Sequence, residues 1–414
     1  MAIGLGALAL PQNREKVGSL KSMKPKQVLI AHQNSIPHYR VRFYELLEER
    51  RPRDWEFRVV FDTCPKRYQR FFKVPITPSQ FKFPILDVRS FFLHPQRDDV
   101  VWQTFFLAAR QADLLITDTY LKNLTYPATL MWKGFGQKRI FWGISRHRSI
   151  PKEEQSPPKR LLEWIKQRMI RCADLFFAYT PGEKEWLIAH GWPEDRVISL
   201  NNTIDTLALR RDYLALKDKR GAVRSELGVS DRHVLIYVGR LIQGKRVEFL
   251  LDSFRRWQAV DPMATLFVSG GGDFGNKLES LAKEAFPEGT VHYFGALPDA
   301  ELSRILLASD VYVIPGRVGL APLTAMCFDL PVVAFDLPIH SPEIEYLTPE
   351  NSVILPASTT PEEFAEQLPK IFEQFSDPAR RAKIYPSIAH LTMEAMVDRF
   401  IEGIERVFAL DRKA

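Results

Sequence analysis

The stretch HVLIYVGRLIQGKRVEFLLDSFRRWQAV (233–260) combines a short apolar run, a tight loop and an amphipathic run. The apolar run at 233–239 is typical of a strand that is buried on both faces. The run at 247–260 has the spacing of a helix with one apolar face. A strand, a tight loop and a helix in this order form the repeating unit of a doubly wound parallel sheet, so this stretch predicts an α/β fold.

The same unit recurs in both halves of the chain. Apolar runs predict further strands at 27–32, 57–62, 114–119, 139–144, 175–180, 197–202, 265–271, 291–295, 311–316 and 331–336. Helical patterns lie between most of them, at 41–50, 101–112, 157–172, 299–309 and within 361–410. The Pro- and Phe-rich stretch 71–99 breaks this rhythm, and it is expected to be an irregular insertion beside a binding site or a packed surface excursion.

A charged stretch without a strand pattern, 205–232, separates the two series. With 414 residues the chain is too long for one hydrophobic core. We therefore expect two doubly wound, Rossmann-like domains at 25–204 and 205–385. Residues 1–24 are expected to form a loose tail, and residues 386–414 a C-terminal helix.

The net charge, the cysteine count and the lengths of the apolar runs limit the possible binding partners and the cellular location of the protein. The formal net charge of +7 suits an anionic ligand, a nucleic acid or an anionic membrane surface. The basic residues are dispersed and no nucleic-acid motif occurs, so we expect no nucleic-acid partner. Three scattered cysteines argue against a disulfide framework or a zinc site and favour a reducing, cytoplasmic location. No apolar run has the length of a membrane span, and the N-terminus lacks the features of a signal peptide.

The loop after the strand at 233–239 carries the strongest functional signal. Gly239 ends the strand, and Arg240 and Lys245 follow before the next helix. Doubly wound sheets bind ligands beyond the carboxyl ends of their strands, and a helix N-terminus there favours an anion. Two cations in this place suit a diphosphate. The alternative is that both are solvated surface charges.

Two more glycine-containing loops follow strands of the second series. In VIPGRVGLAPLTAMCFDLPVVAF (313–335), Gly316 and Gly319 precede a helix that is expected to open near Ala321–Pro322. In SGGGDFGNKLESLA (269–282), Gly271 lies in a turn that resembles a phosphate loop only loosely, and a plain flexible turn is the alternative. Together the loops favour a phosphate-bearing ligand at one edge of the second sheet.

With these segments in view, the chain resembles the retaining GT-B glycosyltransferases of the group 1, family 4-like type. The resemblance is carried by FAYTPGEKEWLIAHGWPEDRVISLNNTID (177–205), by the Gly-Arg…Lys loop and by residues 312–345. It implies two domains that face each other across a cleft, with the acceptor in the first and the donor in the second. It also implies that the C-terminal helix packs back on the first domain.

The resemblance further implies an activity. A sugar would pass from a nucleotide-sugar donor to an acceptor hydroxyl with retention of configuration, in polysaccharide or glycolipid biosynthesis. Arg240 and Lys245 would neutralise the departing nucleoside diphosphate. No DxD triplet occurs, so no metal is expected, and the nucleotide sugar is a substrate rather than a cofactor. The expected partners are that donor and a saccharide or lipid-linked acceptor.

The sequence departs from the family at two glutamates that normally lie eight positions apart. Gly316 and Thr324 occupy their places, which marks a variant subgroup, and Thr324 offers a ribose only a hydroxyl. The backbone amides of Gly319 and Leu320 remain available for donor phosphate.

Glu343 or Glu345, in the neighbouring segment HSPEIEYL (340–347), is a candidate for the missing acidic contact with the donor. The alternative is that these glutamates stabilise the N-terminus of their own helix.

Candidate residues on the acceptor side are less sharply defined. Asp118, at the end of LLITDT (114–119), is the best-placed carboxylate to orient an acceptor hydroxyl, and helix capping is the alternative. His38 and Arg40 lie in a first strand-to-helix segment that resembles one bacterial branch of the family. His147, in a basic Arg-His-Arg loop, replaces a histidine that relatives carry nearby, and a solvated turn is the alternative.

The segment KRLLEWIKQRMIRCADLFF (159–177) mixes basic and apolar residues at helical spacing. It is either a helix that contacts an anionic membrane surface or one whose apolar stripe is core. Two other functions remain open beside the transferase. A catalytically silent scaffold need not keep Arg240 and Lys245, whereas a nucleotide-sugar epimerase needs an acid/base pair that the sequence does not reveal.

Overall fold

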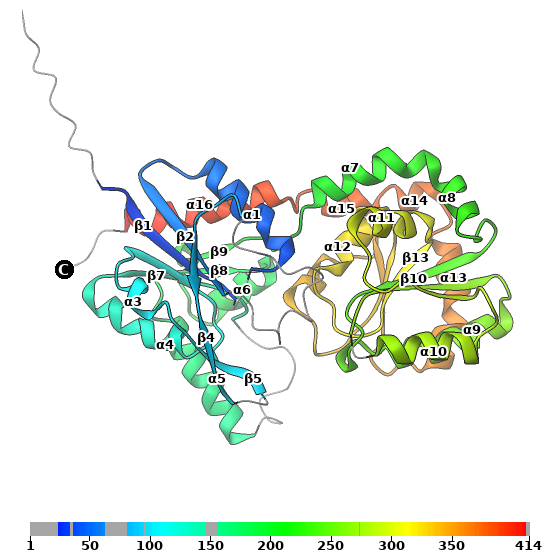
Figure 1. Ribbon diagram of the computed structural model, residues 1–414, viewed down its shortest axis with the longest axis horizontal. Coiled ribbons are helices and arrows are strands. Elements are labelled where there is room, and N and C mark those ends of the chain that lie inside the picture. The colour runs from blue at the N-terminus through cyan, green and yellow to red at the C-terminus, as the bar shows by residue number, and fades with distance from the viewer. Residues whose placement is uncertain are drawn as a thin grey trace, which may run out of the picture.

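The computed structural model describes residues 24–33, 36–62, 81–94, 97–145, 156–272 and 274–410. Each of the two domains contains a parallel sheet with helices on its faces (Figure 1). This arrangement confirms the predicted α/β fold of two doubly wound domains.

The first domain is built on a seven-stranded sheet with the order β3-β2-β1-β6-β7-β8-β9. Its strands are β1 (Lys26–Ala31), β2 (Trp55–Asp62), β3 (Ile85–Val88), β6 (Leu114–Thr117), β7 (Lys138–Trp142), β8 (Leu175–Ala178) and β9 (Val197–Ser199). Its helices are α1 (His38–Arg50), α3 (Phe106–Ala109), α4 (Thr125–Ala128), α5 (Pro157–Ile170) and α6 (Pro181–Ala189), with short 3-10 turns η2 (Thr129–Phe135) and η4 (Glu194–Arg196). The strand order reverses between β1 and β6, which are neighbours.

The second domain is built on a six-stranded sheet with the order β12-β11-β10-β13-β14-β15. Its strands are β10 (His233–Val238), β11 (Ala264–Ser269), β12 (Val291–Tyr293), β13 (Val311–Ile314), β14 (Val332–Phe335) and β15 (Ser352–Leu355). Its helices are α7 (Thr206–Leu216), α8 (Arg220–Glu226), α9 (Val247–Val260), α10 (Gly275–Ala285), α11 (Asp299–Ala308), α12 (Ala321–Met326), α13 (Pro361–Gln374), α14 (Pro378–Arg381) and α15 (Ile384–Ile388), with 3-10 turns η5 (Lys217–Lys219), η6 (Gln243–Lys245) and η7 (Pro342–Tyr346). Here the strand order reverses between β10 and β13.

Two expectations for the first domain were wrong. Residues 101–112, expected as a helix, begin with the end of strand β5 (Arg97–Gln103), and only the four-residue α3 is helical. β5 pairs antiparallel with β4 (Ser90–His94), and Phe91 lies opposite Trp102, so cross-strand pairing overrides the local helical pattern. The described part of 71–99 is not an irregular insertion, because it contains strand β3, which pairs with β2 and extends the sheet.

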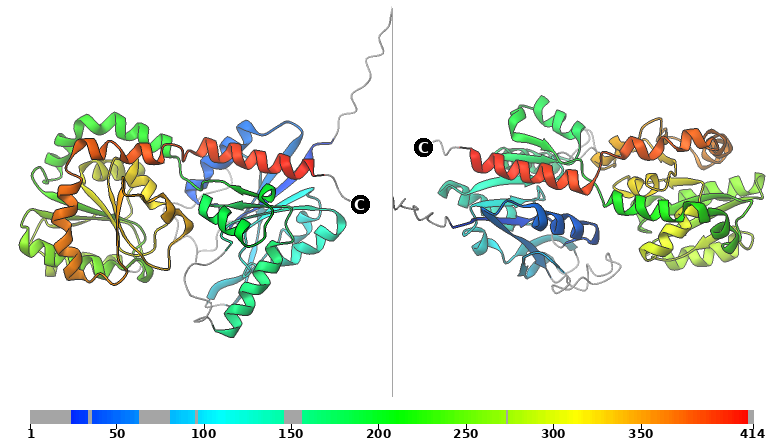
Figure 2. Two further views of the ribbon diagram at one scale, coloured as in Figure 1. Left: turned by 180° about the vertical axis from the view of Figure 1, so that it is seen from behind. Right: turned by 90° about the horizontal axis from the view of Figure 1, so that it is seen from above.

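The chain crosses back to the first domain later than residue 386. Ile384, Ile388 and Leu391 belong to the core of the second domain. The last helix, α16 (Met393–Ala409), buries Met396, Phe400 and four further side chains in the core of the first domain. Figure 2 shows this helix, in red, lying along the first domain. The Thr392 side chain caps α16 by accepting a hydrogen bond from Ala395 N, so the crossing is complete at that residue.

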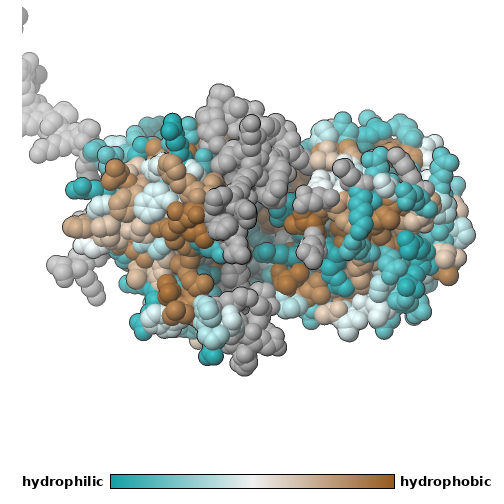
Figure 3. Space-filling model, turned by 60° about the horizontal axis from the view of Figure 1, so that its bottom comes forward, coloured by the Kyte–Doolittle hydropathy of each residue, from teal (hydrophilic) through white to brown (hydrophobic). Residues whose placement is uncertain are grey.

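Within the described residues, no helix combines the length and the apolar character that a membrane span requires. The space-filling view in Figure 3 shows hydrophobic patches on both domains, among them several on the first domain at the left of that view.

Candidate functional site

Two loops of the second domain meet at the point where its strand order reverses. One follows β10 and contains Gly244 and Lys245, and the other follows β13 and contains Gly316. A Cβ atom added to Gly316 would lie 2.6 Å from Gly244 O and 2.6 Å from Lys245 Cα. Only glycine permits this approach, so Gly316 allows the two loops to pack together.

A third loop, after β11, packs against the first of these. Leu241 N donates to Gly271 O over 2.9 Å. Gly270 and Gly272 have φ values of +146° and +147°, and a Cβ atom on either would overlap the backbone of the loop after β10. Gly271 itself is exposed, with no atom within 4 Å of the place of a Cβ. Ligands of doubly wound sheets bind at such a reversal point, which three backbone-lined loops form here.

Three cations of this loop cluster, Arg240, Lys245 and Arg317, are candidates to hold an anion. A fourth, Arg246, donates to Pro315 O over 3.3 Å. Arg240 is exposed, and its carbonyl accepts a hydrogen bond from the Tyr237 hydroxyl over 3.0 Å. Lys245 Nζ donates to Arg317 O over 2.7 Å. Burial, and then the positive charges of Arg240 and Arg317, lower the pKa of Lys245 to about 8. A bound anion would offset both effects, because it compensates the desolvated ammonium and screens the neighbouring cations.

The loop after β13 is held by a residue that sequence reasoning missed. The Nδ1 atom of His340 accepts from Val318 N over 3.0 Å, and its Nε2 atom lies 2.6 Å from Phe335 O. Ser341 N donates to Val318 O over 3.1 Å. A lone histidine in a Pro- and Glu-rich segment gave no sign that its ring would support a loop more than twenty residues earlier.

The expected helix after this loop is present as α12, and it is only six residues long. Leu320 precedes its first residue, and Thr324 on its second turn is half-buried. Gly319 has open space where a Cβ would lie. Gly319 and Leu320 therefore lie beside the cationic loop cluster, and their contact with a donor stays a prediction.

The two candidate glutamates lie at the junction between the domains. Asn202, in the linker, donates from Nδ2 to Glu343 Oε1, and Glu343 Oε2 is buried without a hydrogen-bond partner in the described structure. Burial raises the pKa of Glu343. Gly182 N, at the start of α6, donates to Glu345 Oε2 over 2.9 Å. Both glutamates thus contact the linker or the first domain, and a ribose contact by Glu343 stays a prediction.

The first domain has its own reversal point, between β1 and β6, and buried side chains fill it. His32 follows β1, and its ring stacks on Trp142 at the end of β7 with 3.7 Å between the ring centroids. Its Nε2 atom lies 3.1 Å from the Tyr179 hydroxyl. Burial and the positive charge of Arg40 hold the pKa of His32 well below its ordinary value, so the ring is neutral. Sequence reasoning missed His32, because its role depends on aromatic residues from distant strands.

Asp118 follows β6 at this same point. Its Oδ1 atom accepts from Thr119 N over 2.5 Å, a contact within the loop. No helix begins here, since the next one, α4, starts at Thr125, so the alternative of helix capping is wrong. Burial raises the pKa of Asp118 to about 6, against the opposing effects of local hydrogen bonds and of Lys166. A Cβ atom on Gly143 would lie 2.8 Å from Asp118 Oδ1, so glycine makes room for the carboxylate. Asp118 therefore has both a local contact and a titration close to neutral pH.

The three remaining candidates for the acceptor side are Arg40, His38 and His147. Arg40 is buried, and its guanidinium donates to Thr203 O over 3.3 Å and to the Asn202 side chain. It ties α1 to the linker, and this placement does not support the acceptor contact that was expected of it. His38 is exposed at the first residue of α1. His147 lies outside the described residues.

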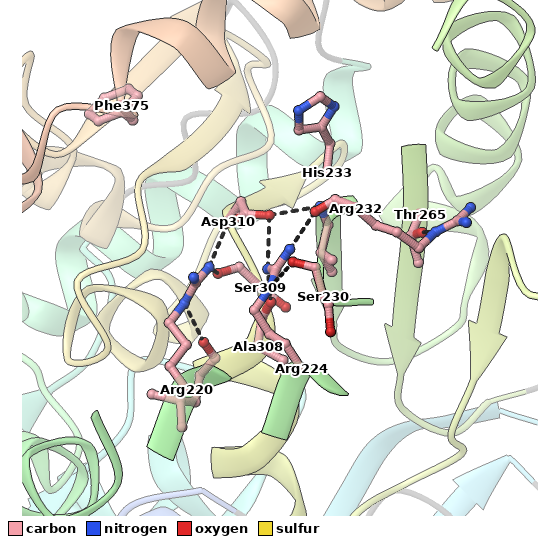
Figure 4. A network of polar contacts seen from close by, with 12 residues as sticks. Arg220, Arg224, Ser230, Arg232, His233, Thr265, Ala308, Ser309, Asp310 and Phe375 are labelled. Atoms are coloured by element: carbon pink, nitrogen blue, oxygen red, sulfur yellow. Dashed lines mark hydrogen bonds and ion pairs between the residues drawn. The ribbon is translucent and has the colours of Figure 1, made fainter. Parts of the chain in front are cut away.

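A second charged cluster lies at the opposite edge of the second sheet (Figure 4). Asp310, just before β13, accepts from Arg220 over 2.6 Å, from Arg224 over 3.2 Å and from Val234 N over 2.9 Å. These residues line a cavity of about 880 Å³ that acidic and basic side chains share. The arginines tie α8 to the sheet, and the cavity lies at the amino ends of β10 and β13, away from the edge where such sheets bind ligands.

Two family models match the two domains in turn. The model described as glycosyl transferase 4-like domain matches residues 39–203. The model described as glycosyl transferases group 1 matches residues 219–385. The second range contains the whole reversal point of its sheet, whereas β1 and His32 lie before the first range.

Curated relatives and solved structures agree with these models. The chain is 26% identical over 126 residues to a GDP-mannose-dependent α-(1-6)-phosphatidylinositol monomannoside mannosyltransferase of Mycolicibacterium smegmatis, and 25% identical over 175 residues to the mannosylfructose-phosphate synthase of Agrobacterium fabrum. These matches cover 28% and 39% of the chain, and 33% and 38% of the relatives' length.

Among solved structures, Anabaena HepE in complex with UDP superimposes with a TM-score of 0.64 at 16% identity, over 92% of this chain and 99% of that one. At this identity the likeness shows the fold alone. The two family models supply the activity class, and the chain accordingly belongs to the glycosyltransferases of the GT-B fold.

Proposed function

We propose that the protein transfers a sugar from a nucleotide-sugar donor to an acceptor hydroxyl with retention of configuration. The observation that carries this proposal is the contact between the loops after β10 and β13, which gathers Arg240, Lys245 and Arg317 around a backbone-lined edge. HepE, which shares the fold, has been solved with UDP and with UDP-glucose. A nucleoside diphosphate fits the charge of this edge.

The cations would act where negative charge develops. As the bond between the sugar and the diphosphate breaks, Arg240 and Lys245 stabilise the departing anion, and the amides of Gly319 and Leu320 support it. A diphosphate oxygen then takes the proton of the acceptor hydroxyl on the same face of the sugar. This route needs no protein nucleophile, and the three cations supply the charge that a metal ion supplies elsewhere. We therefore expect turnover without added metal or cofactor.

The first domain would hold the acceptor. Asp118, with a pKa of about 6, is ionised at neutral pH and accepts a hydrogen bond from the acceptor hydroxyl. Neutral His32, stacked on Trp142, lies buried at the same reversal point. The acceptor class that we propose is a saccharide or a lipid-linked saccharide of polysaccharide or glycolipid biosynthesis, made on the cytoplasmic side.

One observation favours a second candidate function, a silent binding protein of the same fold. Gly316 replaces a glutamate that contacts the donor sugar in the family that the sequence resembles. The glutamate cannot be restored in this loop arrangement, because the place of the Cβ is 2.6 Å from the backbone of Lys245. A silent protein would bind a nucleotide but release no sugar.

Thermal unfolding with a panel of nucleotides and nucleotide sugars tests the donor site. A ligand that binds only the folded state raises Tm, by an amount that grows with its concentration over Kd. We expect one nucleoside diphosphate and its sugar conjugate to raise Tm. Arg240→Ala should abolish the shift, whereas Arg211→Ala, an exposed control on α7, should keep it.

A second measurement separates the two candidate functions. Release of nucleoside diphosphate from the stabilising nucleotide sugar, measured with a chelator present, and the anomeric configuration of the product report transfer and its stereochemistry. Stabilisation without release in the presence of acceptors would favour the silent binding protein. No stabilisation by any member of the panel would contradict both.

A further inference from the structure

Helix α5 presents apolar side chains to solvent. Leu161, Leu162, Trp164 and Ile165 have exposed fractions of 57%, 53%, 56% and 39%. A surface helix of a globular protein normally turns such residues toward the core. The four residues are consecutive except for Glu163, and they leave a continuous apolar strip along more than one turn of the helix.

Two polar residues of the same helix, Lys166 and Gln167, face inward. Lys166 is 6% exposed, and burial lowers its pKa against the opposing charges of Glu163, Asp118 and Glu183. Gln167 Nε2 donates to Ser145 O over 2.9 Å. The inner face of α5 thus makes polar contacts beside Asp118 and packs Met169 and Ile170 into the core, whereas the outward apolar strip is not part of the core.

Basic residues are interspersed with this strip. Arg160 and Arg168 on α5 are exposed, and so is Arg171 just after it, which donates to His190 O over 2.7 Å. The Arg168 guanidinium lies 5.3 Å from the centre of the Trp164 ring. The only acidic residue of α5 is Glu163, which accepts a hydrogen bond from Gln167 and is half-buried. The outer face is therefore apolar and positively charged at once.

The concentration of exposed apolar side chains belongs to α5, because four of them lie within five residues there. Among the described residues, eleven exposed large hydrophobic side chains lie between 91 and 165 and seven lie elsewhere; the eleven are Phe91, Leu93, Leu107, Tyr120, Leu124, Met131, Phe135, Leu161, Leu162, Trp164 and Ile165. Figure 3 shows hydrophobic surface on the first domain. Exposed apolar surface of this extent marks an interaction site.

We propose that the outer face of α5 docks on an anionic membrane surface. A second copy of this chain carries the same net charge of +7, whereas anionic headgroups offer a layer of negative charge to these arginines. The apolar side chains enter the boundary between headgroups and acyl chains, the tryptophan lies at that boundary, and the arginines reach the phosphates. This goes beyond the proposed transfer reaction, since docking requires neither donor nor turnover.

The orientation of the docked protein follows from the two faces of α5. The apolar face lies on the lipid, and the polar face, with Lys166 close to the Asp118 carboxylate, points toward the reversal point of the first sheet. Docking would therefore hold the first sheet's reversal point close to the membrane, on the far side of α5 from the lipid.

Co-sedimentation of the full chain with vesicles tests the docking surface. We expect binding to phosphatidylcholine vesicles that contain phosphatidylglycerol, weaker binding to phosphatidylcholine alone, and weaker binding at high salt. Trp164→Ser combined with Ile165→Ser should lower the partition coefficient roughly tenfold or more, since two apolar side chains no longer enter the lipid. The single variant Trp164→Phe should keep most of the binding, because an aromatic side chain still enters the lipid.

Matched controls use exposed residues of the second domain. Val260→Ser with Met263→Ser removes as many exposed apolar side chains and should leave binding unchanged. Arg168→Glu should weaken binding to the anionic vesicles, whereas Arg211→Glu on α7 should weaken it far less. Equal loss in the paired variants, or no binding of the unaltered chain to anionic vesicles, would overturn the proposal. A dimer in solution that the Trp164 and Ile165 changes dissociate would also overturn it, because the strip would then be a protein interface.

Discussion

The two sheets have the same design, and their reversal points are opposite in chemistry. At the junction of β10 and β13 in the second domain, glycines bring backbone close to backbone and three cations surround the gap. At the junction of β1 and β6 in the first domain, a neutral histidine and a carboxylate lie among buried aromatic rings. In the function that we propose, the second domain binds the donor's diphosphate through positive charge and main-chain groups. The first domain binds the acceptor through side chains.

The largest expected effect is at Lys245. Lys245→Ala should lower kcat/KM for transfer roughly 10²- to 10³-fold, because it removes one donor from a group whose charge grows in the transition state. Lys245→Arg should keep part of the activity. Initial rates with the nucleotide sugar identified by thermal unfolding measure the effect. A loss below about threefold would place the diphosphate elsewhere and remove the basis of the comparison.

Gly316→Ala tests the contact between the two loops of the second domain. The added methyl group meets the backbone of Gly244 and Lys245, so the loops must separate and donor affinity should fall roughly 10- to 100-fold. Gly221→Ala on α8 is the control, since nothing lies within 4 Å of its Cβ position. Calorimetric titration with the nucleoside diphosphate measures both. If Gly316→Ala bound normally, loop contact would not shape the site.

Asp118→Asn tests the first domain. We expect kcat to fall roughly tenfold or more, because the amide is a weaker acceptor for the hydroxyl that it orients. Turnover by the unaltered protein should rise with pH through about 6 as the carboxylate ionises, and the variant should lose this dependence.

Stability separates that role from a structural one. The folded-state pKa of Asp118, about 6, lies above the ordinary value of 3.8, so the folded state holds the proton more tightly than the unfolded state does. The stability contributed by Asp118 therefore declines as pH rises from about 4 to 6. At pH 7 the Asp118→Asn variant should have a Tm equal to or above that of the unaltered protein. A clear drop in Tm would instead indicate that the carboxylate mainly caps its loop.

The smallest expected effect is a pH dependence of donor binding. In the protein without ligand, Lys245 has a pKa of about 8 rather than 10.5, so it loses its proton as pH rises through 8. When a diphosphate is bound beside it, the negative charge keeps Lys245 protonated. Nucleoside diphosphate affinity should thus fall above pH 8 by up to roughly tenfold per pH unit. Lys245→Arg should flatten this dependence. A flat profile in the unaltered protein would mean that Lys245 does not touch the phosphates.

The sequence alone could predict the site in the second domain better than the site in the first, because the two depend on contacts of different range. The loops of the second domain are local, since Gly239, Arg240 and Lys245 follow their strand directly and their order is visible in the chain. His32, Lys166 and His340 were not predicted, because each acts on residues distant in sequence. The helix expected at 101–112 failed for a related reason: its apolar residues fit either period, and pairing with β4 selects the strand.

The crossing of α16 to the first domain has a consequence for synthesis. The core around Trp142, Phe177 and Phe43 packs against Phe400 and its neighbours, which the ribosome makes after the whole second domain. The first domain therefore emerges first and completes last. Until residues 393–409 arrive, that face of its sheet stays uncovered, and a nascent chain at this stage is a natural client for chaperones that hold exposed aromatic surface.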